Sequence, residues 1–552
     1  MKKELQIQKP LLLALIILTI LRWVMAGSNE LSEDEAYYHM WSERYAASYY
    51  SKGPGIATVM KISTTIFGHS EFGIRFFSPL LALGSSLMLF RLGRGIFGRQ
   101  SAGWAVLLLN ITPIFNAGSM LMTIDPLSIF FWIAAMLMVW HALHRASKWT
   151  FYWPLAGLMI GLGFLAKYTN ALLLLSIALL LIVHRRWRGQ LRKPGPYLAL
   201  GVFVLCTIPV LVWNQQHDWI TVTHLKERGN LDEATGFKPG EALVFFLGHL
   251  GVYSPLIFIG MLWALAISIG RFFKDEGEAF LVAFALPIIA LYFALSFHSG
   301  GELNWTSPGF VSISLLLAHH WFRWDGSLLL KNRLRRAAII IAVGMSILAL
   351  NTDLVRQLGI QWSYKRDPRL PALTVGAALT KPHLVLSNAD DPSTRLRGWK
   401  SSANYVAEII RAQEEPVFLI ANRYQTAAAF SYYLPDDVAI IRPTDAHPRV
   451  HTAESNAPEH QFWFWPGYAQ VDEVKMVPSP DGTDTFREES SAFIGKDALY
   501  ITDNMKRKSP DERIKNSFRD YQMVMVVDIM RRGQFLRQIR VFHCSQYKGL
   551  DL

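Results

Sequence analysis

Long apolar runs separated by short polar segments cover the chain as far as residue 351. A helix needs about 20 mostly apolar residues to cross a hydrocarbon layer about 30 Å thick. Eleven runs approach that length, and we expect each of them to form a membrane-spanning helix. They lie near residues 9–26, 73–92, 102–119, 126–144, 152–167, 169–184, 197–213, 242–270, 279–297, 306–321 and 336–351. The fifth and sixth runs are separated only by residues 167–170, so one long span there would leave ten.

Basic residues decide between these two counts. If the N-terminus is cytoplasmic, the inner loops become 91–99, 145–148, 184–193, 271–274 and 323–336, and all of them are basic. Cytoplasmic loops of membrane proteins carry an excess of Lys and Arg, so this pattern favours eleven spans and an extracytoplasmic C-terminal region. Alternatively, the first run is a cleaved signal peptide, because residues 24–27 (Val-Met-Ala-Gly) resemble a cleavage site. The remaining spans would still form a polytopic protein.

The apolar runs stop near residue 351, and the turn-rich stretch 365–371 follows. We therefore expect a membrane domain over residues 1–351 and a soluble α/β domain over residues 352–552. Within the second domain, the pattern predicts strands at 417–421, 498–502, 524–529 and 535–542, and a helix at 424–433 that Pro435 ends. No phosphate loop, metal-ligand spacing or nucleophile elbow is present in this region of the sequence.

Composition agrees with a membrane protein and excludes other classes. The chain has 552 residues, of which 51% are hydrophobic, which is too apolar for one soluble domain of this length. Its net charge of +12 comes from Lys and Arg that cluster in short loops, where they set orientation rather than bind nucleic acid. The two cysteines, Cys206 and Cys544, can supply neither a disulfide framework nor a thiolate metal site.

Polar residues from five separate outer segments are expected to meet at one face of the membrane. Charged groups at a membrane edge are costly unless they face water or a polar cavity, so they suggest a functional site. The acids Asp34 and Glu35 come just after the first span. The other segments are the start of the fourth span, the break at 167–170, and the loops 214–241 and 298–305.

This mixture of acids and cations suits the transfer of a sugar from a lipid phosphate to a hydroxyl or amine. A carboxylate can take the acceptor proton as general base, while Lys and Arg stabilise the charge that develops on the departing phosphate. Polyprenyl phosphate is itself a reasonable leaving group, so the sequence requires no cofactor. A divalent metal is compatible with the chemistry, but no paired carboxylate spacing indicates one.

The order of several motifs resembles that of the GT-C membrane glycosyltransferases, most closely the bacterial branch of the protein mannosyltransferase and lipid A aminoarabinose transferase (ArnT-like) family. Each motif is weak alone, but together and in order they are specific over residues 10–350. They are Asp34-Glu35, Tyr49-Tyr-Ser-Lys-Gly-Pro54, Phe67-Gly-His-Ser-Glu-Phe-Gly-Ile-Arg75, Thr123-Ile-Asp-Pro-Leu127, Gly163-Phe-Leu-Ala-Lys167 and Asn304-Trp-Thr-Ser-Pro308. The resemblance implies a GT-C fold, an undecaprenyl-phosphate-type sugar donor, an inverting displacement, and a periplasmic site on the bacterial inner membrane.

Single residues match the motifs of this family. Asp34 matches the acid of the first outer loop on which catalysis depends, and we predict that it is the base. Lys52 matches the lysine that contacts the lipid phosphate in the aminoarabinose transferases, and Tyr49 matches the tyrosine just before it. Ser51 stands where those transferases have an acid, which is a departure from the aminoarabinose pattern. Asp125 matches an acid at the start of a span.

The predicted site therefore has three groups of residues. Asp34 and Glu35 are the catalytic candidates. The donor phosphate is assigned to Lys52, Tyr49, Lys167, Arg228 and His224, and the rest of the substrates to Asp125, Glu302, Asn304 and Trp305. Structural roles stay open beside these, because acids favour helix starts, lysines snorkel to the interface and tryptophans gather there.

The predicted function is sugar transfer to an extracytoplasmic acceptor, which could be lipid A or lipopolysaccharide, another envelope glycan, or a protein. The alternatives are a polyprenyl-lipid flippase or transporter, and an inactive glycosyltransferase-like scaffold. Transporters usually place ionisable residues at the membrane midplane between two related halves. In this chain the polar residues collect at one face and no repeat is visible, which favours the enzyme.

Overall fold

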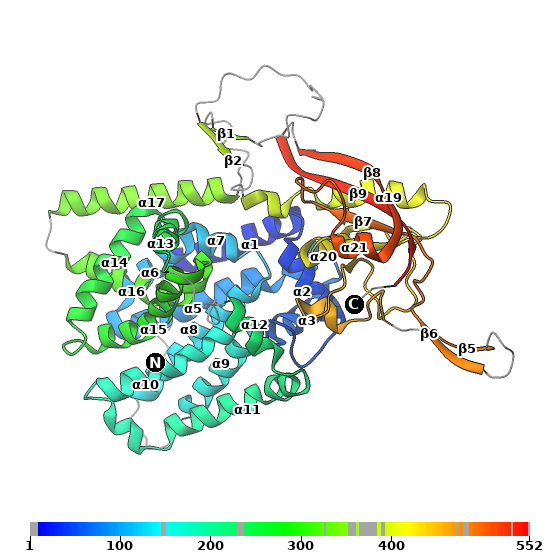
Figure 1. Cartoon of the computed structure of the whole chain (residues 1–552). Coiled ribbons are helices and arrows are strands. Elements are labelled where there is room, and N and C mark those ends of the chain that lie inside the picture. The colour runs from blue at the N-terminus through cyan, green and yellow to red at the C-terminus, as the bar shows by residue number, and fades with distance from the viewer. Residues whose placement is uncertain are drawn as a thin grey trace. The chain divides into compact units, whose positions relative to one another are not determined.

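The computed structural model describes residues 9–144, 151–228, 237–324, 327–350, 360–363, 384–387, 392–470, 473–478, 485–531 and 534–549 (Figure 1). Their contacts divide the chain into two compact units. The first, which we call the membrane unit, comprises Met1–Ser28 and Trp41–Asn351; the second, the C-terminal unit, comprises Asn29–Met40 and Thr352–Leu552. Residues 29–40 lie within the domain 1–351 that the sequence predicts, yet by contact they belong to the C-terminal unit.

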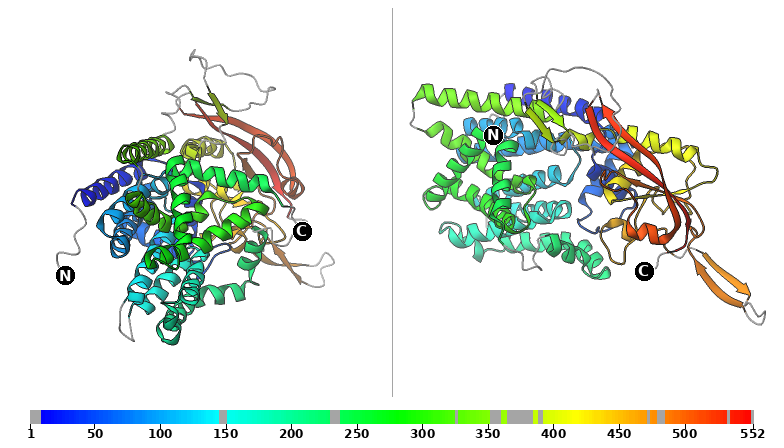
Figure 2. Two further views of the ribbon diagram at one scale, coloured as in Figure 1. Left: turned by 90° about the vertical axis from the view of Figure 1, so that its left-hand side faces the viewer. Right: turned by 45° about the horizontal axis from the view of Figure 1, so that its top comes forward.

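The membrane unit is built from helices (Figure 2). Its longer helices are α1 (Lys9–Ser28), α3 (Gly55–Phe67), α5 (Phe77–Phe97), α6 (Arg99–Ile111), α8 (Ile124–His144), α9 (Tyr152–Ala166), α10 (Leu172–Val183), α11 (Gly195–Gln216), α13 (Pro239–Tyr253), α14 (Pro255–Gly270), α15 (Glu276–Ser299), α16 (Ser307–Arg323) and α17 (Leu328–Leu350). Its shorter ones are α4 (Glu71–Arg75), α7 (Pro113–Gly118), α12 (Ile220–Arg228), η1 (Tyr168–Ala171), η2 (Arg188–Arg192) and η3 (Leu303–Thr306). Helix α2 (Glu33–Glu43) begins in the C-terminal unit and ends in the membrane unit.

The chain is a membrane protein with several apolar helices. Among the described residues, five helical segments are long and apolar enough to cross a membrane: α1, α4 with α5, α8, α11 and α15. Helices α13 and α14 would make a sixth if they count as one span. Each of the eleven predicted runs contains a helix, but the number of spans, eleven, stays a prediction.

Two helix breaks bear on the predicted spans. As predicted, α9 and α10 are separate, because Lys167 is extended (φ −150°, ψ 119°) and the short helix η1 follows it. The run 242–270, predicted as one segment, is instead bent by 113° between α13 and α14. Ser254 lies at the bend with a φ of +71° and precedes Pro255, which disfavours a helical conformation in the residue before it and readily starts a new helix.

Burial separates the helices at the centre of the membrane unit from those at its surface. Residues 307–320 of α16 are all buried, and most of α8 is buried, including Trp132, Ile133 and Met136. A helix that is apolar on every side fits inside a bundle. In contrast, α1 and α11 leave most of their apolar side chains exposed, as expected for helices that face lipid.

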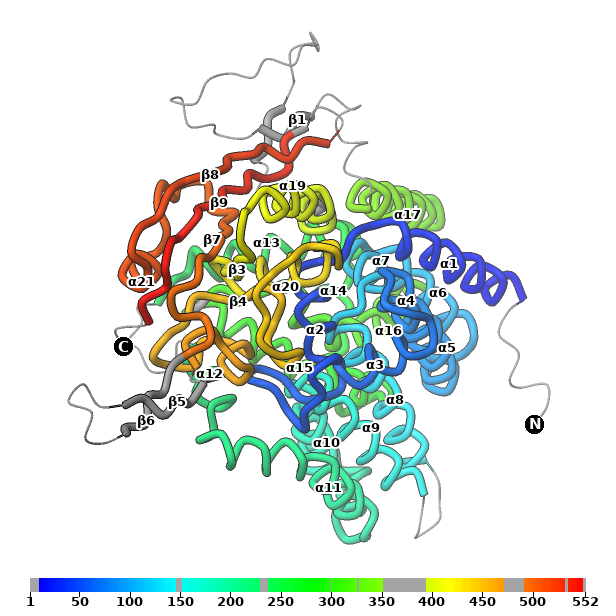
Figure 3. Tube along the Cα trace, turned by 90° about the vertical axis from the view of Figure 1, so that its right-hand side faces the viewer, coloured from blue at the N-terminus to red at the C-terminus, as the bar shows by residue number. Residues whose placement is uncertain are grey.

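The C-terminal unit contains a five-stranded mixed sheet in the order β4-β3-β7-β9-β8 (Figure 3). Strands β3 (Phe418–Ala421), β4 (His451–Thr452) and β7 (Ala498–Thr502) are parallel, while β8 (Phe518–Arg531) and β9 (Gln534–Tyr547) are antiparallel. Its helices are α19 (Trp399–Arg411), α20 (Tyr424–Tyr433), α21 (Glu512–Ser517), η5 (Pro392–Leu396) and η6 (Gln461–Phe464). Two further pairs are β1 (Ile360–Ser363) with β2 (Leu384–Ser387), and β5 (Glu473–Pro478) with β6 (Thr485–Ser490). The predicted strands and helix of this region are confirmed.

Glycine allows α9 and α11 to pack closely in the membrane unit. A Cβ atom on Gly157 would lie 2.1 Å from the carbonyl oxygen of Ala199, which is backbone and cannot turn aside. Gly201, also on α11, has open space at the same position. Both glycines therefore lie within helices, but only Gly157 is packed closely against a neighbouring backbone.

We predict that Gly157→Ala destabilises the protein by about 1–3 kcal/mol, because the new methyl group forces the two helices apart. Gly201→Ala should be neutral or stabilising by up to about 1 kcal/mol, because alanine has the higher helix propensity. Thermal unfolding of both variants in detergent micelles measures the difference. Equal melting temperatures would contradict the close approach of α9 and α11.

Candidate active site

The first turn of α2 contains three successive carboxylates, and the third of them, Glu35, caps the start of the helix. The Glu35 carboxylate accepts hydrogen bonds from the backbone nitrogen of Ser32 at 2.9 Å and from its hydroxyl at 3.0 Å. The Glu35 backbone nitrogen lies 3.3 Å from the same hydroxyl. This reciprocal arrangement is a capping box, and Glu35 is fully buried in it. Glu35 therefore has a structural role, and its predicted part in catalysis stays a prediction.

The other two carboxylates of this turn have different surroundings. Glu33 accepts a hydrogen bond from Arg423 at 3.0 Å, and burial raises its pKa while Arg423 opposes the rise. Asp34, between Glu33 and Glu35, has an exposed side chain. Of the three carboxylates, Asp34 is thus the one that a substrate can reach most directly.

Tyr49 stabilises the first loop of the membrane unit from within. Its ring stacks on Trp41 with 4.4 Å between ring centroids, and its hydroxyl donates to the Trp41 carbonyl at 2.9 Å and accepts from the Ala46 nitrogen at 3.1 Å. Burial raises its pKa. The backbone nitrogen of Tyr49 also donates to the Lys52 carbonyl at 3.0 Å. The Tyr49 hydroxyl is therefore occupied within the loop, which gives Tyr49 a structural role, and its predicted contact with the donor phosphate stays a prediction.

The Gly-Pro-Gly sequence after Lys52 packs against the end of α9. A Cβ atom would lie 2.5 Å from the carbonyl oxygen of Leu165 if placed on Gly53, and 2.8 Å from the nitrogen of Ala166 if placed on Gly55. Only glycine permits this approach. Lys52 is thereby held next to the helix break where Lys167 follows α9.

Three basic side chains from two distant segments lie near one another: Lys52 from the first loop, and His224 and Arg228 from α12. His224 on α12 lies against Tyr50, with 4.6 Å between ring centroids. Burial, together with the smaller effects of the charges on Lys52 and Arg228, lowers the pKa of His224 to about 4. His224 and Arg228 are four residues apart, so they share one face of α12. The structure thus groups three of the five residues predicted to bind the donor phosphate.

Aromatic rings lie beside this cation cluster, which consists of the cations Lys52 and Arg228 and the imidazole of His224, neutral near pH 7. The Arg228 guanidinium lies 5.1 Å from the centre of the Trp305 ring, and Tyr292 on α15 packs against Trp305 at 5.0 Å. A cation at this distance from an indole ring is attracted by the ring electrons. Trp305, predicted to bind substrate, therefore lies next to Arg228.

The Asp125 carboxylate joins three separate segments of the membrane unit. One of its oxygens lies 2.7 Å from the Lys167 ammonium, and the other accepts from the Asn304 amide at 2.6 Å. Lys167 is buried, with 5% of its surface exposed. Asp125, predicted to contact substrate, thus binds two other predicted site residues, Lys167 and Asn304. Their contact with the substrates stays a prediction.

The structure brings most of the predicted residues of the membrane unit into two groups, one around Asp125 and the other being the cation cluster. Two residues that are adjacent in the sequence connect these groups. Asn304 of the Asp125 group precedes Trp305 beside the cation cluster. Glu302, just before them, is exposed. Sequence reasoning missed Glu33 and Arg423 in the C-terminal unit, because no local pattern connects residues 390 positions apart.

Chemically, the membrane unit offers positive charge and aromatic surface, and the first turn of α2 offers an accessible carboxylate. Cations and aromatic rings of this kind suit a phosphate group linked to a sugar. A carboxylate of this kind can accept a proton from an attacking hydroxyl or amine.

Comparison with known proteins gives related sequences. Residues 51–213 match the family model "Dolichyl-phosphate-mannose-protein mannosyltransferase". The chain is 30% identical over 311 residues to lipid A galacturonosyltransferase RgtD of Rhizobium johnstonii, an alignment that covers 55% of this chain and 64% of that protein. It is 26% identical over 330 residues to undecaprenyl phosphate-alpha-4-amino-4-deoxy-L-arabinose arabinosyl transferase 2 of Pseudomonas fluorescens, covering 56% and 59%. The chain thus spans about three fifths of the length of these relatives.

Comparison with solved structures identifies the fold. The crystal structure of ArnT from Cupriavidus metallidurans bound to undecaprenyl phosphate superposes with a TM-score of 0.58 at 14% identity, covering 96% of this chain and 97% of that chain. The apo structure of the same protein gives a TM-score of 0.57 at 13% identity over the same shares. The predicted resemblance is confirmed: the chain has the fold of ArnT, and its sequence is similar to those of lipid A galacturonosyltransferase RgtD and the aminoarabinose transferases.

Proposed function

We propose that the protein transfers one sugar from an undecaprenyl-phosphate-type donor to an acceptor on the extracytoplasmic side of a bacterial inner membrane. The observation that carries this proposal is the cation cluster of Lys52, His224 and Arg228 beside Trp305. These residues come from three distant parts of the chain. Positive charge gathered in this way is suited to a phosphate, and phosphate is the leaving group of this reaction.

In the proposed reaction, a hydroxyl or amine of the acceptor attacks the anomeric carbon from the face opposite the phosphate. The new bond to the sugar forms as the bond between that carbon and the phosphate oxygen breaks, so the configuration inverts. Asp34 takes the proton of the attacking group. Lys52 and Arg228 stabilise the charge on the departing polyprenyl phosphate, while Asp125, Lys167 and Asn304 hold the surrounding segments in position.

The relatives support the substrate classes in this proposal. One carries the name of a lipid A galacturonosyltransferase, and another that of an arabinosyl transferase for an undecaprenyl phosphate-linked aminosugar. The structural neighbour was solved with undecaprenyl phosphate bound. Lipid A or lipopolysaccharide is therefore the acceptor class that we favour over another envelope glycan or a protein. The basic loops predicted to be cytoplasmic support the periplasmic placement of the site.

Asp34→Asn should reduce transfer by about 100-fold or more, because the change removes the base but keeps the side-chain volume. The measurement is transfer of radiolabelled sugar from synthetic polyprenyl-phosphate sugars to envelope lipid by purified protein. Binding of undecaprenyl phosphate should persist in the variant, which shows that the protein is folded. Undiminished turnover would overturn the assignment of Asp34, and absence of transfer by the wild type with every donor would overturn the function.

Arg228→Gln should weaken donor binding by about 10- to 100-fold, as expected when a charge-assisted hydrogen bond is lost. Lys226→Gln is the matched control, because residue 226 lies two positions from 224 and 228 and faces another side of α12. Titration of undecaprenyl phosphate into both variants measures the effect. Similar affinities in the two variants would contradict the assignment of Arg228 to the donor phosphate.

Binding of the donor phosphate should raise the pKa of His224 above its value of about 4 in the free protein, because an anion nearby favours the imidazolium form. Donor affinity should therefore increase as the pH falls from 7 towards about 4, the pKa of His224 in the free protein, with proton uptake on binding. Calorimetric titration in two buffers of different ionisation enthalpy measures that uptake. His224→Gln keeps the titration of the phosphate itself, so equal uptake in the variant and the wild type would show that His224 takes no part.

A further inference from the structure

The segment that contains Asp34 is anchored in the C-terminal unit at its beginning. The Glu30 carboxylate accepts hydrogen bonds from the backbone nitrogens of Trp399 at 2.6 Å and Lys400 at 3.3 Å. These are the first two residues of α19, whose N-cap, Gly398, has no side chain to cap the helix. Glu30 therefore satisfies orphan N–H groups of α19 and adds negative charge at its positive end.

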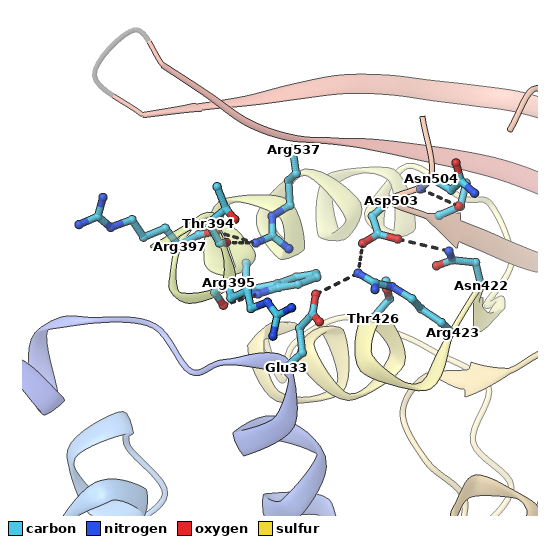
Figure 4. A network of polar contacts seen from close by, with 12 residues as sticks. Glu33, Thr394, Arg395, Arg397, Asn422, Arg423, Thr426, Asp503, Asn504 and Arg537 are labelled. Atoms are coloured by element: carbon cyan, nitrogen blue, oxygen red, sulfur yellow. Dashed lines mark hydrogen bonds and ion pairs between the residues drawn. The ribbon is translucent and has the colours of Figure 1, made fainter. Parts of the chain in front are cut away.

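Glu33 is anchored by an arginine that is itself fixed by a second carboxylate (Figure 4). Arg423 lies at the start of α20 and pairs with Glu33 at 3.0 Å and with Asp503, which follows β7. Its Nε atom also lies 3.2 Å from the Thr426 hydroxyl, and Asp503 accepts from Asn422 at 3.2 Å. The two carboxylates raise the pKa of Arg423 although burial lowers it. Arg423 is thus a charged bridge between α2 and the sheet.

A second arginine adds to the charge balance behind this bridge. Arg537 lies with its guanidinium 3.5 Å from the centre of the Trp399 ring and donates to the Arg397 carbonyl at 3.0 Å. Burial lowers its pKa to about 10, while Glu33, Asp503 and Glu30 oppose that change. Figure 4 shows Arg537 on the side of the network towards α19. Three acids thus lie near two arginines, which compensate two of the three negative charges.

Aromatic residues fix both ends of the same segment. The backbone nitrogen of Leu31 donates to the Tyr433 hydroxyl at 2.6 Å. The Tyr37 hydroxyl accepts from the backbone nitrogen of Gln461 at 2.7 Å, and its ring lies 4.5 Å from that of Tyr424. Helix α20 therefore contacts the segment at Tyr424 and Tyr433 as well as at Arg423.

We propose that Arg423, held by Asp503, is a positioning residue for the transfer reaction: it fixes the first turn of α2 through Glu33 and thereby orients the Asp34 carboxylate. This inference rests on the proposed function, in which Asp34 is the base. Asp34 lies between Glu33, bound to Arg423, and Glu35, bound in the capping box, so its own backbone has little freedom while its side chain is exposed. The C-terminal unit is then required for the geometry of catalysis.

The position of Arg423 separates this role from a general role in folding. The apolar core of the C-terminal unit is formed by residues such as Phe418, Tyr500 and Phe542, and Arg423 is not part of it. The Arg423 side chain is 41% exposed, so its removal leaves no cavity in that core. A misplacement of about 1 Å in a catalytic group can nevertheless cost about 100-fold in rate.

Steady-state kinetics test the positioning role. Arg423→Gln should lower kcat by about 10- to 100-fold and leave the donor KM almost unchanged, because the donor phosphate is bound elsewhere. Arg423→Lys keeps the charge and should recover part of the loss. The control is Arg411→Gln, which removes an exposed pair between Arg411 on α19 and Asp437 in the same unit, 2.8 Å apart, and should leave kcat unchanged. A normal kcat in Arg423→Gln would overturn the proposal.

A double variant tests whether Arg423 acts through Glu33. Glu33→Gln should lower kcat by about the same factor as Arg423→Gln, and the two changes combined should lower it no further. Losses that multiply in the double variant would show that the residues act independently, and would overturn the mechanism.

Hydrogen exchange tests the anchoring without any sugar transfer. In Arg423→Gln, amides of residues 33–37 should exchange several-fold faster than in the wild type, whereas Arg411→Gln should leave them unchanged. Unchanged exchange in Arg423→Gln would overturn the anchoring even if the enzyme is active. A wild type that transfers no sugar would instead overturn the proposed function, and exchange would still decide whether Arg423 holds the segment.

Discussion

The arrangement of the membrane unit depends on two contacts of the Asp125 carboxylate, an ion pair and a hydrogen bond. It binds the buried ammonium of Lys167 and the amide of Asn304, and so joins the start of α8, the break between α9 and α10, and the turn η3. Removing one partner of a buried ion pair costs about 3–5 kcal/mol, because the other charge is left without compensation. This acid thus helps to hold η3 in position, and with it Trp305 beside Arg228, together with contacts such as that of Tyr292 with Trp305.

Close backbone packing adds a second constraint at the same place. Gly53 and Gly55 allow the loop after Lys52 to rest on the last turn of α9, directly before Lys167. The loop and the helix break are therefore held against each other by contact, and the break is held to α8 by charge. This packing helps to hold Lys52 where its charge acts on His224, which lies against the nearby Tyr50.

Three adjacent acids in α2 show how one residue type takes different roles. Glu35 closes a capping box, Glu33 pairs with an arginine of the C-terminal unit, and Asp34 stays exposed. Two of the three are used to build the turn that presents the third. A proton acceptor that must keep its orientation benefits from neighbours that are already fixed, since less freedom is lost when the substrate binds.

Much of this protein could be predicted from its sequence, because helices, strands and breaks follow from local patterns. The strand at 498–502 and the helix at 424–433 were predicted with their exact bounds, and the break at Lys167 with its position. The motif order also indicated the fold family. Pro255 is a local signal for a helix break, but only the tertiary structure decided the 113° angle of the bend there. It also decided the pairing of Lys167 with Asp125 and the membership of residues 29–40 in the C-terminal unit. The contacts of Asp125 with Lys167 and Asn304, and of Glu33 with Arg423, join residues that are 42, 179 and 390 positions apart in the chain. Such contacts leave no periodic signal in one sequence, because they form only when the chain has folded.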